Sequence, residues 1–168
     1  RAPYFLSKGI SGNFVAFGLA TDAMTQLAVT ILLAPLLMRY PARILGAAAF
    51  AIEAVALILA IFTTETWQMF IANIMAGLGV GTLMLLQTVI WPTYFGRANI
   101  GAIRGLATPI SLVFSAAGAT VTGLVFDASG SYFIAWWIAT AGLVIGSVML
   151  GLTRPPKWTP FKHEVASG

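Results

Sequence analysis

The sequence ILGAAAFAIEAVALILAIF occupies residues 44–62 and contains a single charged side chain, that of Glu53. A helix rises about 1.5 Å per residue, so a segment of this length spans roughly 30 Å of hydrocarbon. Four more apolar segments of comparable length lie at residues 14–38, 69–91, 103–126 and 132–152. The linkers between them are only a few residues long. We therefore predict an all-α, polytopic membrane bundle of five transmembrane helices over residues 14–152.

The composition supports a membrane protein and excludes several other classes. Hydrophobic residues make up 59% and charged residues 8% of the chain, against roughly 25% charged residues in a soluble domain. The net charge of +4 forms no dense basic face, so we expect no nucleic-acid partner. The chain has no cysteine, and its one histidine, His163, lies near the C-terminus. We therefore expect no metal, no cofactor and no enzymatic activity; an intramembrane enzyme would have to pair Asp22 with Glu53.

The charges between the segments predict an orientation. If all five segments cross the membrane, seven of the nine basic residues fall on one side: Arg39, Arg43, Arg97, Arg104, Arg154, Lys157 and Lys162. The positive-inside rule makes this side cytoplasmic. The N-terminus is then outside and the C-terminus is cytoplasmic. We expect residues 1–13 to be an outer loop or the end of a missing helix, and residues 153–168 to be a cytoplasmic tail.

Two acidic residues lie within the apolar segments. Asp22 shares one helix face with Gln26 and Thr30. A carboxylate at membrane depth costs at least about 2.5 kcal/mol, so it usually faces a bundle interior or a watery cavity. Asp22 could instead be solvated at the outer interface or bond a neighbouring helix. Glu53 has no polar residue three or four positions away on its helix. It is either a proton carrier or a neutral acid bonded to another helix.

The third and fourth segments carry small and polar residues at helical spacing. Gly77 and Gly81 form a G-x-x-x-G pattern, which favours close helix packing. Gln87 could contact a substrate or bond across helices. Small residues recur along one face of the fourth segment, where they suit a polar path or tight packing equally well: Thr108, Ser111, Ser115, Gly118 and Thr122. Pro109, near the start of that segment, favours a kink.

Two motifs resemble the major facilitator superfamily of transporters. The sequence WPTYFGRANIGAIRGLATP at residues 91–109 is similar to the inner loop between helices 10 and 11 of bacterial monocarboxylate-type and oxalate/formate-type members. The sequence GLVFDASGSY at residues 123–132 is similar to their link between helices 11 and 12. The resemblance makes the five segments helices 8 to 12, with the N-terminal half missing. It implies secondary active transport of a small-molecule substrate by alternating access, coupled to a proton or another ion, in the bacterial inner membrane.

The superfamily's inner signature is only partly present. In residues 34–43 the matching residues are Leu36, Arg39 and Arg43, whereas the motif glycine is Ala34 and its acidic residue is Met38. The resemblance implies an inner gating loop with four arginines, Arg39, Arg43, Arg97 and Arg104.

The resemblance also suggests where a substrate would bind. It places helices 8, 10 and 11 at the cavity and helices 9 and 12 outside, which leaves Glu53 on helix 9 unexplained. Thr30 stands where anion-transporting members tend to have an arginine, so an anionic substrate lacks an evident partner in this half. A cationic, zwitterionic or neutral polar solute would suit it as well. The substrate- or ion-binding candidates are Asp22, Gln26, Thr30, Gln87, Ser111 and Ser115. The alternative function is that of a non-transporting membrane interaction or assembly protein.

Overall fold

The computed structural model describes residues 2–37, 39–95 and 100–153, and over these residues the chain is helical, without strands. In chain order the helices are α1 (Ala2–Ser7), α2 (Gly12–Leu32), α3 (Ala34–Leu37), α4 (Ala42–Phe62), α5 (Thr66–Phe95), α6 (Ile100–Ser129) and α7 (Phe133–Leu152). Five of them, α2 and α4 to α7, are long and apolar enough to cross a membrane. The predicted fold class, an all-α polytopic membrane bundle, is confirmed.

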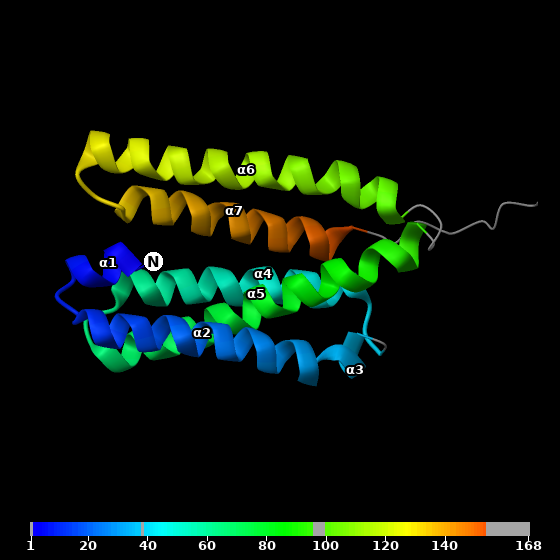
Figure 1. The fold of residues 1–168 in the computed structure, drawn as a ribbon, viewed down its shortest axis with the longest axis horizontal. Helices are drawn as coiled ribbons and strands as arrows, with labels where there is room; N and C mark the ends of the chain where they lie inside the picture. The colour runs from blue at the N-terminus through cyan, green and yellow to red at the C-terminus, as the bar shows by residue number, and fades with distance from the viewer. Residues whose placement is uncertain (1, 38, 96–99, 154–168) are drawn as a thin grey trace, which may run out of the picture.

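The boundaries of the first span differ from the prediction. The sequence suggested one segment over residues 14–38, but α2 ends at Leu32 and the short helix α3 follows. Pro35 accounts for the break, because its ring has no N–H and would clash with the carbonyl of Ile31 in a continuous helix. At Pro109, in contrast, α6 continues without interruption (Figure 1).

The long helices pack in a defined order (Figure 1). Helix α5 packs against α2 on one side and α4 on the other, and α4 also packs against α7. Helix α6 runs beside α7 and makes only weak contact with both α7 and α5. No residue of α6 whose burial is described is buried, and large side chains such as Leu112 and Phe114 are exposed. Such a surface fits a lipid solvent, in which exposed apolar side chains carry no penalty.

Three glycines allow α5 to pack closely between its two neighbours. A Cβ atom added to Gly77 would lie 2.7 Å from Thr25 Cβ, and one added to Gly81 would lie 3.0 Å from Gln26 Cα, both on α2. Gly79 points the other way, and a Cβ there would lie 3.1 Å from the Ala49 carbonyl oxygen on α4. The packing role predicted for the glycine pattern is confirmed. The third glycine adds a second interface that the pattern did not predict.

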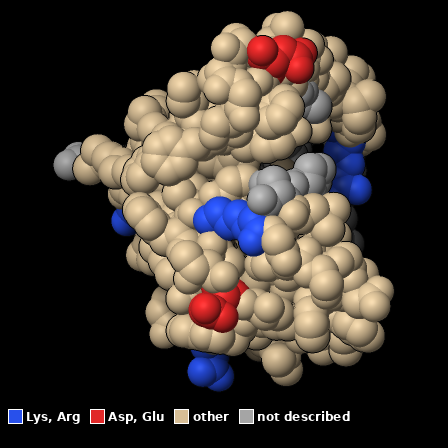
Figure 2. All heavy atoms as spheres, turned by 90° about the vertical axis from the view of Figure 1, so that its left-hand side faces the viewer, with Lys and Arg blue, Asp and Glu red and all other residues tan. Residues whose placement is uncertain are grey.

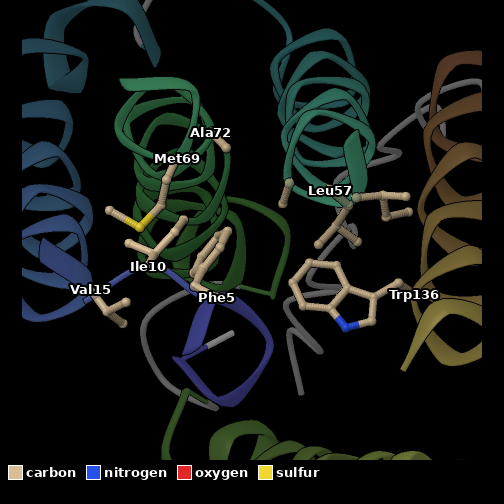
Figure 3. Close-up of a cluster of buried hydrophobic side chains, with 9 residues drawn as sticks. Phe5, Ile10, Val15, Leu57, Met69, Ala72 and Trp136 are labelled. Atoms are coloured by element: carbon tan, nitrogen blue, oxygen red, sulfur yellow. The ribbon is translucent and has the colours of Figure 1, made fainter. Parts of the chain in front are cut away.

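The first thirteen residues contain a helix that packs onto the bundle. Gly9, with φ of 82°, turns the chain between α1 and α2, a backbone conformation that favours glycine. Phe5 of α1 is 1% exposed and lies within a buried cluster of side chains from α2, α4, α5 and α7 (Figure 3). This segment, expected as an outer loop or the end of a helix, is therefore packed against four other helices. The expected tail at residues 153–168 lies outside the described residues apart from Thr153.

Candidate functional site

A cavity of about 440 Å³ lies between the C-terminal half of α5 and the N-terminal half of α6. Helical spacing places its residues on the facing sides of the two helices. The lining residues are Met84, Gln87, Thr88, Arg104, Ala107, Thr108 and Ser111. Among them Arg104 carries the only charge. Four of the residues singled out in the sequence are thus brought together: Gln87, Arg104, Thr108 and Ser111.

The polar groups of this cavity divide into donors and acceptors. The hydroxyls of Thr88 and Ser111 donate to carbonyl oxygens of their own helices, at 3.1 Å to Met84 and 2.9 Å to Ala107. Their lone pairs are then available as acceptors. Arg104 and Gln87 carry N–H groups that can donate to a ligand, up to five in the guanidinium. The set can therefore bind a small polar solute and favours one with an anionic group.

Asp22 and Gln26 lie at the contact between α2 and α5 rather than among the residues lining this cavity. The Gln26 Nε2 donates to Asp22 Oδ1 at 3.2 Å, and both side chains are half-buried. Asp22 faces Gly77, where Oδ1 would lie 3.1 Å from an added Cβ. Thr30 is exposed, and its hydroxyl donates to the Gln26 carbonyl at 2.8 Å. The predicted polar face of this helix thus spans a helix contact and an exposed position.

Glu53 lies at the contact between α4 and α5. Its side chain is 7% exposed, and its Oε2 would lie 3.0 Å from a Cβ added to Gly79. The resemblance had placed helix 9 on the outside of the bundle, which left an acid there without an explanation. In the structure α4 packs on both α5 and α7, and Glu53 belongs to the face that packs on α5.

The hydroxyl residues of α6 do not form one continuous lining. Thr108 and Ser111 line the cavity, whereas Ser115 is exposed outside it. Thr122 lines a separate hollow of about 200 Å³ with Leu57, Ala135, Trp136 and Ala139. The polar path suggested by the stripe is therefore divided between two spaces, and Gly118, between them, has no neighbouring atom within 4 Å of an added Cβ.

The predicted gating arginines have different surroundings. Arg43 Nη1 donates at 3.0 Å to the carbonyl of Thr153, the residue that caps the C-terminus of α7. It thereby joins the start of α4 to the end of α7. Arg39 is exposed in the connection between α3 and α4, and Arg97 lies outside the described residues. Arg104 is among the residues that line the cavity between α5 and α6.

Sequence reasoning missed Thr88, Tyr4 and Lys8. Thr88 follows Gln87 and lies four residues after Met84, so helical spacing could have added it to the lining. Tyr4 and Lys8 contact residues more than 50 positions away in the chain. No local pattern indicates such a contact.

Comparisons with known proteins give one distant relative. The chain is 27% identical over 166 residues to human Monocarboxylate transporter 7 (Homo sapiens). The matched region covers 96% of this chain but 32% of the relative, so the chain spans about a third of the relative's length. The similarity is consistent with a partial major facilitator superfamily fold. No protein family profile and no solved structure matches the chain.

Proposed function

We propose that the chain is part of a secondary active transporter that moves a small solute across the membrane by alternating access. In this proposal α2, α4, α5, α6 and α7 are helices 8 to 12 of a twelve-helix protein, and the other half of the substrate path is formed by its N-terminal helices. The support comes from the five membrane-spanning helices and from the similarity to a transporter along nearly the whole chain.

The cavity between α5 and α6 carries the proposal. Its volume of about 440 Å³ lies within the range of small-molecule sites, roughly 300–1,000 Å³. Arg104 offers a planar guanidinium, which can bind a carboxylate through two parallel hydrogen bonds. The relative's name is that of a monocarboxylate transporter. We therefore propose a small monocarboxylate as substrate. Arg104 would bind its carboxylate, and so supplies the partner for an anion that was not evident from the sequence.

The orientation is also part of the proposal. Arg39, Arg43 and Arg104 lie at the end of the bundle where α2 ends and α4 begins (Figure 1). Glu65, in the α4–α5 connection, and Asp127, in the last turn of α6, lie at the opposite end. The positive-inside rule then places the arginine end in the cytoplasm. We further propose that a proton or another ion is transported together with the substrate.

Substitution of Arg104 tests this function. The assay is uptake of labelled pyruvate by the full-length protein in proteoliposomes. Arg104→Gln should lower kcat/KM roughly tenfold or more, because a hydrogen bond to a charged group contributes about 1.5–3 kcal/mol. Arg104→Lys keeps the positive charge but loses the planar guanidinium, so its kcat/KM should lie between those of the wild type and Arg104→Gln. Glu65→Gln, an exposed position at the other end, is the control. Wild-type kcat/KM in Arg104→Gln would exclude Arg104 as the anion partner.

A further inference from the structure

We propose that α1 is a latch that holds one end of the bundle closed. This end, the α1 end, is where α1 lies against the end of α4 and the beginnings of α2 and α7 (Figure 1). The proposal rests on three sets of contacts made by Tyr4, Phe5 and Lys8.

The first set consists of hydrogen bonds to the C-terminus of α4. Lys8 Nζ donates to the carbonyl of Thr63 at 2.7 Å and to that of Ile61 at 2.5 Å. The Tyr4 hydroxyl donates to the same Ile61 carbonyl at 3.0 Å. The last carbonyls of a helix have no partner within the helix, and their partial negative charge favours a cation. Lys8 and Tyr4 therefore cap α4 from a segment more than 50 residues away in the chain.

The second set is aromatic and joins α1 to α7. The ring of Tyr4 lies 4.8 Å from that of Trp136, measured between centroids. Lys8 Nζ lies 4.9 Å from the centroid of the Tyr4 ring, within the range of a cation–π interaction. One tyrosine is thus held by the ammonium, by Trp136 and by the carbonyl of Ile61. Through this tyrosine the end of α4 and the beginning of α7 are both joined to α1.

The third set closes the space beneath α1. Phe5 packs in a buried cluster with Ile10 and Val15 near the start of α2, Leu57 of α4, Met69 and Ala72 of α5, and Trp136 of α7 (Figure 3). The ring of Phe5 therefore fills the space among four helices. If α1 moved away, the buried cluster that contains Met69 and Ala72 would lose Phe5.

The turn at Gly9 supplies a hinge between α1 and α2. Lys8 is itself exposed, so water can compete for its hydrogen bonds. Charged groups on the face at this end are few and separated by uncharged surface (Figure 2). The polar contacts of the latch are thus hydrogen bonds from Lys8 and Tyr4 to carbonyl oxygens, and water can take the place of either partner in these bonds.

In transport, release of the latch would favour opening of the α1 end, and its closure would favour the opposite state. This consequence rests on the proposed function. The latch itself can be measured without any transport assay.

Single cysteines provide the measurement, because the chain has none of its own. Ala72→Cys probes the cluster beneath α1, and Ala49→Cys probes a buried site on α4 outside that cluster; these residues are 3% and 0% exposed. Each is introduced into the full-length protein, with any cysteines elsewhere in it replaced. The rate of reaction with a water-soluble maleimide is then measured in detergent solution. Lys8→Gln should raise the reaction rate at Ala72→Cys about fivefold or more and leave the rate at Ala49→Cys unchanged. Lys8→Arg, which keeps the positive charge, should react at Ala72→Cys at the rate found with Lys8.

Two results would overturn the latch. If Lys8→Gln leaves the rate of maleimide reaction at Ala72→Cys unchanged, Lys8 does not hold α1 in place. Parallel increases at Ala72→Cys and Ala49→Cys would show general loosening of the bundle. Tyr4→Phe removes only the hydroxyl that reaches Ile61 and gives a second, milder variant, expected to change the same site in the same direction. It decides the outcome if Lys8→Gln cannot be purified.

Discussion

Gly77 of α5 lies directly against the backbone of Asp22 in α2. A Cβ atom on Gly77 would lie 2.6 Å from the Asp22 carbonyl oxygen, closer than real Cβ atoms approach. The obstacle is backbone, so no rotation of a side chain could relieve the overlap. The polar face of α2 is therefore held against α5 at a position that accommodates only glycine.

Gly77→Ala should consequently destabilise the bundle. Excess volume at a close-packed contact typically costs about 1–3 kcal/mol. We expect a lower midpoint of thermal unfolding in detergent. Gly142→Ala in α7 is the matched control, because no atom lies within 4 Å of its added Cβ and alanine favours a helix over glycine by about 1 kcal/mol. Equal midpoints for the two variants would contradict the close contact at Gly77.

Much of this fold was predictable because its solvent is lipid. Spanning helices must satisfy their backbone groups internally, so five apolar segments predict five helices. The glycine spacing also predicted a close contact at Gly77 and Gly81. The second contact, between Gly79 and Glu53, was not predictable, since nothing in the sequence shows that α5 lies between α2 and α4.

The candidate site was predictable only in part, for a similar reason. Polar residues on one face of a helix, such as Ser111 and Ser115, look equivalent in sequence. Which of them lines a cavity depends on how the neighbouring helix is placed, and the cavity between α5 and α6 is lined by Ser111 but not by Ser115. The capping of α4 by Lys8 depends on a long-range contact and has no local signature.

Ser111→Ala and Ser115→Ala should therefore differ in transport. Both residues lie on α6 one turn apart, but only Ser111 lines the cavity. Loss of its hydroxyl removes one acceptor, and a neutral hydrogen bond contributes about 0.5–1.5 kcal/mol. We expect a several-fold lower kcat/KM for pyruvate uptake by Ser111→Ala and near wild-type uptake by Ser115→Ala. Equal losses in both variants would instead support the whole stripe as the substrate path.

Cysteine labelling in intact cells tests the orientation. Cysteines at Glu65 and Asp127 should react with a membrane-impermeant maleimide added outside. Both positions are exposed at the same end of the bundle, Glu65 in the α4–α5 connection and Asp127 in the last turn of α6. A cysteine at Tyr40, exposed in the connection between α3 and α4 at the other end, should react only after the membrane is permeabilised. Labelling of Tyr40→Cys from outside would reverse the proposed topology.

Asp22 and Glu53 are expected to contribute differently to transport. Asp22 is half-buried on α2 and accepts a hydrogen bond from Gln26. A carboxylate with partial access to water can bind a cation or exchange a proton in each cycle. Glu53 is enclosed between α4 and α5 against Gly79, where a neutral acid avoids the cost of burying a charge. Its contribution should therefore be to helix packing.

Asp22→Asn should abolish uptake or uncouple it from the co-transported ion, whereas Glu53→Gln should retain most of the wild-type rate. Both substitutions nearly preserve the size of the side chain and keep one oxygen acceptor, so the packing should be nearly unchanged. They remove the negative charge and the ability to exchange a proton. The measurement is uptake by the full-length protein at equal expression, from mildly acidic to mildly alkaline pH. If Glu53→Gln stops uptake and Asp22→Asn does not, the transported ion or proton passes through the α4–α5 contact rather than along α2.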